Sequence, residues 1–140
     1  MSRTALSAPP HASPLWRVAA GVGVIFGLVT LMAGGRVLLG ADPGYVVYKP
    51  LLLFNTAMGL AYLAVGVLSW RRHALALPGA ALVALANLGV LVALALRFES
   101  GGPIATTSLG AMSFRTAVWV ILFLLLRRAA RRGAPHADVG

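Results

Sequence analysis

Four apolar runs, each long enough to cross a bilayer, constrain this chain more than any other feature of its sequence. They cover about residues 18–39, 51–70, 77–96 and 108–126. A hydrocarbon core of about 30 Å needs close to 20 apolar residues in a helix, and each run reaches about that length. Lipid offers no partner for backbone N–H and C=O groups, so segments of this length satisfy those groups only as helices. The sequence therefore predicts an all-α membrane protein, a bundle of four transmembrane helices with short loops.

The composition agrees with lipid as the main solvent. Hydrophobic residues make up 59% of the chain and charged residues only 11%, whereas soluble domains carry roughly 25% charged residues. A formal charge of +9 would indicate nucleic-acid binding in a soluble protein. Here the basic residues stand at the ends of the apolar runs, which favours the membrane and argues against a nucleic-acid partner. The chain contains no cysteine, which excludes disulfides and thiolate metal sites.

The basic residues also predict an orientation. One side of the spans carries eight of them: Arg3, Arg17, Arg71, Arg72, Arg127, Arg128, Arg131 and Arg132. The other side carries four: Arg36, Lys49, Arg97 and Arg115. Because cytoplasmic loops hold the excess of Lys and Arg, we expect both termini in the cytoplasm. A single lysine among twelve basic residues is typical of a GC-rich bacterial genome, so the predicted location is a bacterial inner membrane.

Two short segments flank the predicted transmembrane domain, residues 15–127. Residues 1–14 are polar and rich in proline, and residues 128–140 are basic at their start. Neither segment has a surface to pack against, so we expect both to be mobile tails. The arginines of the RRAARR motif are expected to contact anionic lipids at the cytoplasmic face: Arg127, Arg128, Arg131 and Arg132.

Small residues spaced four apart predict where the helices pack. Lipid tails are as apolar as leucine, so helices in a bilayer associate where small side chains let their backbones approach. Four such pairs occur: Gly23 and Gly27, Ala57 and Ala61, Ala80 and Ala84, and Gly89 and Ala93. We expect these pairs to serve packing within the chain, with dimerisation as the alternative. The third span has small residues around much of its circumference and is expected to be central, whereas the bulky fourth span is expected to face lipid on more than one side.

Polar residues within the spans form a predicted layer in the outer half of the bilayer. With a rise of 1.5 Å per residue, Arg115 lies roughly 18 Å from Arg127, and Asn55 and Asn87 fall at similar depths. An arginine inside a membrane needs acceptors for its protons. We therefore expect Arg115 to anchor a hydrogen-bond network with Asn55 and Asn87, with Glu99 as its counter-ion. The alternative is that Arg115 is an anchor at the outer interface.

The outer side carries more positive charge than the topology requires. Its four basic residues are opposed by only two carboxylates, Asp42 and Glu99. Such an excess could hold a phosphate, a carboxylate, a lipid headgroup or a quinone carbonyl, with Arg115, Arg36, Lys49 and Arg97 as the candidate residues. The alternative is that these long side chains reach the lipid headgroups at the helix ends.

The spans lack the residues that several membrane chemistries need. The three histidines, His11, His73 and His136, lie outside the spans, so we expect no haem, metal site or other cofactor. No span contains Asp or Glu, which argues against a proton-coupled carrier such as a small multidrug-type exporter. A Ser-His-Asp set and a carboxylate pair are also missing, so enzymatic hydrolysis is not expected.

Two classes of function remain. The first, which we favour from the sequence, is a non-catalytic accessory or scaffold subunit that packs against a larger membrane protein or a second copy of itself. The second is binding or transport of a small anionic, lipid or quinone-like ligand at the polar layer. In size and number of spans the chain resembles the DoxX-type small bacterial membrane proteins, a resemblance of outline that no motif extends to particular residues.

Overall fold

A computed structural model of the chain describes residues 14–133. These residues form four α-helices: α1 (Pro14–Leu38), α2 (Lys49–Trp70), α3 (Ala76–Glu99) and α4 (Thr106–Gly133). No strand occurs within this part of the chain. All four helices are long and apolar enough to cross a membrane, so the predicted all-α fold with four such helices is confirmed. The predicted tails fall largely outside the described residues.

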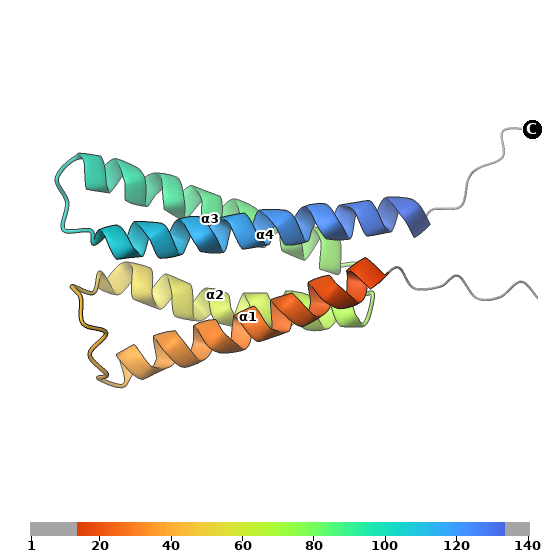
Figure 1. Cartoon of the computed structure of the whole chain (residues 1–140), viewed down its shortest axis with the longest axis horizontal. Helices are drawn as coiled ribbons and strands as arrows, with labels where there is room; N and C mark the ends of the chain where they lie inside the picture. Colours follow the sequence, from red (N-terminus) through yellow and green to blue (C-terminus); the bar gives the residue numbers. More distant parts are fainter. Residues whose placement is uncertain (1–13, 134–140) are drawn as a thin grey trace, which may run out of the picture.

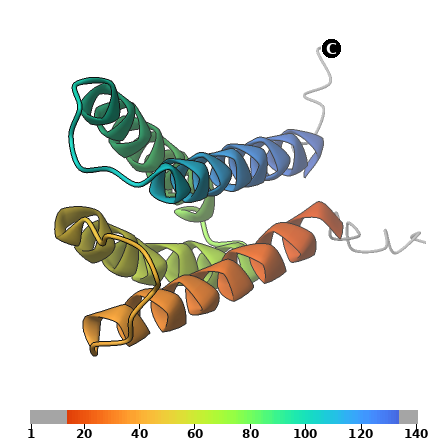
Figure 2. The same cartoon turned by 60° about the vertical axis from the view of Figure 1, so that its left-hand side comes forward.

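The helices form two antiparallel hairpins that lie against each other, α1 with α2 and α3 with α4 (Figure 1). Each helix contacts two others, in the order α1, α2, α3, α4 and back to α1. The third helix therefore has two neighbours like the rest and is not more central than they are. We call the end with residues 39–48 and 100–105 the loop end, and the end with the short α2–α3 turn the arginine end. Figure 2 shows the two hairpins diverging toward the loop end.

Local sequence explains where the chain reverses. In the α1–α2 loop, the backbone N–H of Gly44 donates to Oδ1 of Asp42 at 2.8 Å, and Gly44 has a φ of 77°. This is the side-chain turn that an Asp two residues before a glycine favours. In the α2–α3 turn, Arg72 adopts a φ of 52°, the one non-glycine residue among those described with a positive φ. Nδ1 of His73 then accepts from the N–H of Leu75 at 3.2 Å.

The closest packing joins α1 to α2 through glycines. A Cβ placed on Gly27 would lie 2.6 Å from the backbone nitrogen of Leu63, and one on Gly66 would lie 2.6 Å from the backbone nitrogen of Val24. The two backbones are therefore in direct contact, as small residues permit. On α1 the contact uses Gly23 and Gly27, the pair found in the sequence.

On the other helices the small residues are divided between the interior and the surface. In α2 the contact with α1 uses Gly59 and Gly66, whereas Ala57 is exposed and Ala61 is half-buried against the core. In α3, Ala80 and Ala84 are buried. The second α3 pair, Gly89 and Ala93, faces outward, and no atom would lie within 4 Å of a Cβ on Gly89. Part of the small-residue surface is thus left open.

Buried side chains gather in two clusters along the bundle. The central core combines all four helices and consists of Ala19, Tyr62, Val65, Ala80, Val83, Ala84, Trp119, Leu122 and Leu126. A smaller cluster near the loop end consists of Leu51, Leu94, Ile104 and Met112. The fourth helix supplies the largest residue of the central core, Trp119, so its bulky sequence serves the interior as well as the surface.

The fourth helix continues beyond the predicted end of its span. Its 28 residues extend about 42 Å, more than the roughly 30 Å of a hydrocarbon core. The RRAARR arginines therefore lie on the helix itself, and all four are exposed: Arg127, Arg128, Arg131 and Arg132. Between them Ala129 is buried, which shows that α4 is still packed against the bundle at this point.

Candidate functional site

A small, partly open polar cavity lies near the loop end of the bundle. Its volume is about 90 Å³. The α1–α2 loop, α2 and the first turns of α4 provide most of its wall, which includes Tyr45, Tyr48, Asn55, Ser108 and Arg115. We call it the Arg115 cavity. No residue of α3 lines it.

Arg115 reaches the cavity because of its place on α4. It stands three residues after Met112 and four before Trp119, and both of these residues are buried. Residues at these spacings share one face of a helix, so Arg115 lies on the inward side. Its position is about 14 Å along α4 from Thr106, which is well below the helix end. The guanidinium Nε is buried and has no hydrogen-bond partner in the protein.

Asn55 lines the same cavity from α2. It is half-buried, and its Oδ1 is buried without a hydrogen-bond partner. The cavity wall therefore carries one unused donor, Nε of Arg115, and one unused acceptor, Oδ1 of Asn55. Buried polar atoms of this kind are rare in folded proteins and call for a partner such as a water or a ligand. Arg115 and Asn55, both predicted as site residues, therefore line the same cavity. Nε of Arg115 and Oδ1 of Asn55 form no hydrogen bond with each other.

Asn87 belongs to a different polar group, deeper in the bundle. The hydroxyl of Tyr62 donates to Oδ1 of Asn87 at 2.7 Å, and both residues are fully buried. The ring of Tyr62 also stacks on Trp119, with centroids 4.8 Å apart. The remaining donors of this group, Nδ2 of Asn87 and Nε1 of Trp119, have no partner. The single network expected from the sequence is therefore divided into one group near the loop end and one in the central core.

The hydrogen bond of Tyr62 to Asn87 was not predicted from the sequence. The sequence did contain one signal for this pair. Counted from the arginine end, Tyr62 and Asn87 lie at nearly the same depth, about 15 Å. Depth alone does not say which faces of two helices meet, so several partners for Asn87 were equally compatible with the sequence.

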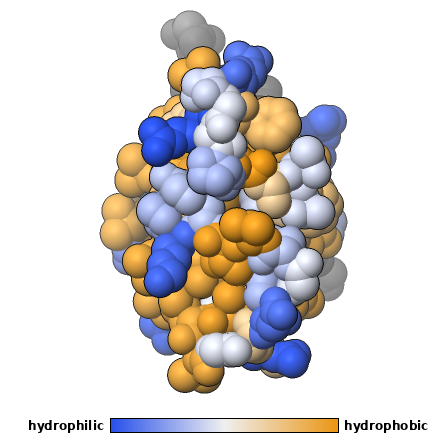
Figure 3. Space-filling view, turned by 90° about the vertical axis from the view of Figure 1, so that its left-hand side faces the viewer, coloured by the Kyte–Doolittle hydropathy of each residue, from blue (hydrophilic) through white to orange (hydrophobic). Residues whose placement is uncertain are grey.

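The other predicted site residues lie at the surface. Glu99 is exposed at the end of α3 and does not line the Arg115 cavity. Arg36, Lys49 and Arg97 are also exposed. Of these three, Arg97 lines a separate groove between α2 and α3. In Figure 3, which shows the loop end, hydrophilic residues surround an apolar centre.

The charge on the wall of the Arg115 cavity suits a ligand that is an anion or a hydrogen-bond acceptor. Arg115 is the one charged residue on its wall, and no carboxylate lines it. Tyr45 and Ser108, which carry hydroxyl groups, also line it. In a medium of low dielectric constant, a fixed guanidinium attracts a negative charge more strongly than it does in water.

Within residues 14–133, no group of three His, Cys, Asp or Glu side chains lies close enough together to hold a metal ion. The polar side chains described above within the bundle are Arg115, Asn55, Asn87 and neighbouring hydroxyl groups.

The chain was compared with protein-family models, with curated proteins and with solved structures. It matches none of them.

Proposed function

We propose that this protein is a non-catalytic membrane protein that binds a small ligand in the Arg115 cavity. In this proposal it lies in a bacterial inner membrane with both termini in the cytoplasm, so the cavity occupies the outer half of the bilayer. One observation carries the proposal: Arg115 and Asn55 line the same cavity, and Nε of Arg115 and Oδ1 of Asn55 are both buried and both without partners.

The energetics favour an occupant. An arginine at membrane depth costs about 2.5–3.5 kcal/mol on insertion scales, and a buried donor without an acceptor costs about 1–3 kcal/mol. A ligand oxygen atom that accepts a hydrogen bond from the Arg115 guanidinium offsets part of both costs. A cavity of about 90 Å³ exceeds the roughly 30 Å³ that one water occupies in the liquid, so it has room for a small polar group.

The two unused atoms define the chemistry of that group. It accepts a hydrogen bond from Arg115 and donates one to Asn55. A singly protonated phosphate monoester satisfies both atoms and also provides the negative charge that matches the guanidinium. Neutral alternatives with an acceptor and a donor, such as a quinol or an amide, satisfy the hydrogen bonds without the charge. Because no carboxylate or histidine lines the cavity, binding is better supported than catalysis.

Substitution of Arg115 tests the proposal. The protein purified in mild detergent is titrated with a short-chain alkyl phosphate and, separately, with a short-chain quinol, while its thermal unfolding is followed. We expect the alkyl phosphate to raise the melting temperature of the wild type and of Arg36→Gln, an exposed arginine at the same end. Arg115→Gln should lose this shift. If neither probe stabilises the wild type, or if Arg115→Gln keeps the shift, the proposal is wrong.

A second function, an accessory subunit, is favoured by the outward face of α3. Gly89 and Ala93 are exposed there, and no atom of the described chain would contact a Cβ on Gly89. A helix of a larger membrane partner, or a second copy of this chain, could approach closely at this face. In membranes solubilised in mild detergent, Gly89→Leu should then release the protein from a larger complex, whereas Gly21→Leu on α1 should not. A wild-type protein that migrates as a monomer would exclude this function.

The arginine end suits contact with anionic lipids. Its exposed basic residues are Arg17, Arg71, Arg72, Arg127, Arg128, Arg131 and Arg132. The two acidic residues of the described chain, Asp42 and Glu99, lie at the opposite end. We therefore propose that this end lies on the cytoplasmic leaflet, where each arginine near the surface contributes about 1 kcal/mol of attraction.

A further inference from the structure

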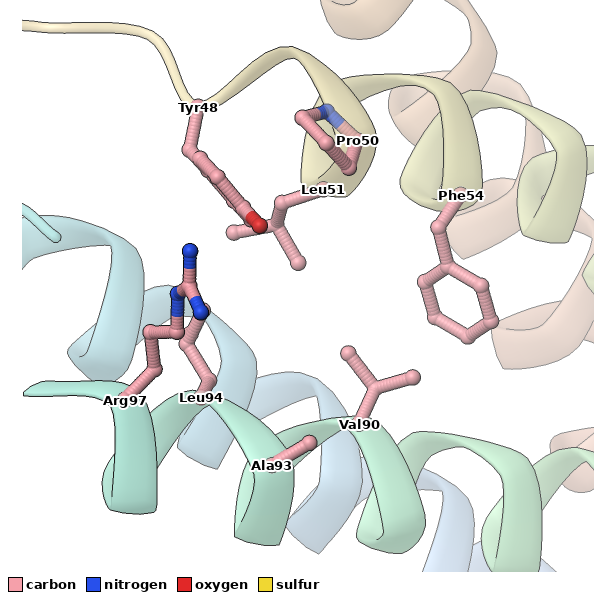
Figure 4. Close-up of a pocket in the computed structure, with 8 residues that line it drawn as sticks. All are labelled: Tyr48, Pro50, Leu51, Phe54, Val90, Ala93, Leu94 and Arg97. Atoms are coloured by element: carbon pink, nitrogen blue, oxygen red, sulfur yellow. The ribbon is translucent and has the colours of Figure 1, made fainter. Parts of the chain in front are cut away.

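A second and larger hollow opens between α2 and α3, separate from the Arg115 cavity. Its volume is about 340 Å³. Apolar side chains from both helices form most of its wall, with Leu51 and Phe54 on α2 and Val90 and Leu94 on α3 (Figure 4). Ala93 lines it and is exposed, so the groove is open at its side. In a membrane, that side faces the acyl chains of the lipids.

The polar groups of this groove are confined to its loop end. Figure 4 shows the hydroxyl of Tyr48 and the guanidinium of Arg97 pointing toward each other across the groove. From Arg97 to Val90 the groove follows α3 for about 10 Å. One leaflet of a hydrocarbon core is about 15 Å thick. The groove therefore covers about 10 Å of the roughly 15 Å of one leaflet, with its polar end where lipid headgroups lie.

The charge at the polar end favours an anionic headgroup. Arg97 is the one charged residue of the groove, and no carboxylate lines it. Glu99 follows two residues later on α3, which places it on another face of the helix. A phosphate can accept two parallel hydrogen bonds from a guanidinium, and the Tyr48 hydroxyl provides another donor. An acyl chain gains little on leaving other lipid chains, so selection among lipids depends on this polar end.

We propose that the groove holds one acyl chain of an anionic phospholipid whose phosphate binds Arg97 and Tyr48. The lipid comes from the leaflet at the loop end, which is opposite to the leaflet contacted by the arginine end. The site goes beyond the ligand proposed for the Arg115 cavity, because it has its own basic residue and its own access from the bilayer. The two cavities share only Tyr48 and Leu51 on their walls.

A fluorescent reporter beside the groove tests the proposal. The chain has no cysteine, so a single introduced cysteine is labelled uniquely. Gly89 is exposed and lies one helical turn from Ala93. A label at Gly89→Cys therefore reports on the end of the groove away from Arg97. Val29→Cys, on the exposed side of α1, is the matched control, because no residue of α1 lines the groove. Each labelled protein is reconstituted with phosphatidylglycerol or phosphatidylcholine that carries bromine on the acyl chains, and quenching gives the relative affinity for the two lipids.

The proposal predicts a preference that is local and depends on Arg97. At Gly89→Cys we expect brominated phosphatidylglycerol to bind about fivefold more tightly than phosphatidylcholine, and at Val29→Cys we expect no preference beyond twofold. Adding Arg97→Gln should reduce the preference at the groove to within twofold, whereas adding Arg36→Gln should leave it in place. Tyr48→Phe should reduce it by a smaller factor.

Three results would overturn the proposal. These are an absence of lipid preference at Gly89→Cys, an equal preference at Val29→Cys, and an equal loss of preference in Arg36→Gln and Arg97→Gln. Leu53→Cys, exposed on α2 beside Phe54, replaces the first reporter if Gly89→Cys does not fold. The outcome can be distinguished from that for the Arg115 cavity, because Arg115→Gln should change the ligand-induced melting shift and not the quenching beside α3.

Discussion

The hydrogen bond between Tyr62 and Asn87 lies near the middle of the bundle, where the alternative to a protein partner is hydrocarbon. It joins α2 to α3, a pair of helices with far fewer close contacts than α1 and α2. Tyr62 also stacks on Trp119 of α4. The same side chain therefore fixes the relative rotation of three helices by a bond and a ring contact.

Removing one partner of this bond should cost more than removing both. Tyr62→Phe keeps the ring contacts but leaves Oδ1 of Asn87 buried and unpaired, and we expect it to lower the free energy of unfolding by about 1 kcal/mol. Tyr62→Phe with Asn87→Leu should recover a large part of that loss. Unfolding in mixed micelles with increasing SDS measures both values. Strictly additive effects of the two substitutions would show that the bond contributes nothing.

The turn between α2 and α3 contains a strained residue. Arg72 has a φ of 52°, a conformation in which a side chain clashes with the following carbonyl. Arg72→Gly removes that strain and should raise the free energy of unfolding by about 0.5–1 kcal/mol. Arg71→Gly is the matched control. Arg71 has a helical φ of −77°, so glycine at this position should lower the free energy of unfolding. Equal responses to the two substitutions, measured in the same SDS titration, would contradict this account of the turn.

Among the helices, the α1–α2 contact is the one that tolerates least change. Backbone lies against backbone there, so an added methyl group cannot be accommodated by rotating a side chain. The α3–α4 contact and the two contacts between hairpins use larger side chains. The bundle thus consists of one hairpin joined through glycines and a second joined through side chains.

Two glycines on α1 provide a direct comparison. A Cβ on Gly27 would lie 2.6 Å from the backbone nitrogen of Leu63, whereas a Cβ on Gly21 would meet no atom within 4 Å. We expect Gly27→Ala to lower the free energy of unfolding by about 1–3 kcal/mol. Gly21→Ala should leave it unchanged or raise it by up to about 1 kcal/mol, because alanine favours the helix. Equal stabilities of the two variants in the SDS titration would show that the α1–α2 contact is looser than described.

The sequence predicted the helices well because length and hydropathy alone decide them in lipid. It also identified Gly23 and Gly27, whose spacing is informative within one helix. The partner face on α2 was missed, because Gly59 and Gly66 are seven residues apart and form no four-residue pair. Which residue faces which across two helices depends on helix rotation, and counting along the chain does not give rotation. For the same reason Arg115 and Asn55 could be placed at one depth, but the separation of Asn87 from them could not be foreseen.

For the whole molecule, the charges of the two ends predict the orientation. The arginine end carries the larger number of basic residues and should face the cytoplasm. In intact cells, a membrane-impermeant maleimide should label Ala41→Cys in the α1–α2 loop, and it should label His73→Cys in the α2–α3 turn only after permeabilisation. The reverse pattern would place the Arg115 cavity in the cytoplasmic half of the bilayer.

The most direct test of the whole account is a density map of the protein in a nanodisc of bacterial lipids. The account predicts a bound group larger than one water in the Arg115 cavity, with polar atoms about 3 Å from Nε of Arg115 and from Oδ1 of Asn55. A map in which the guanidinium extends between acyl chains, or in which water alone occupies the space beside Asn55, would contradict it.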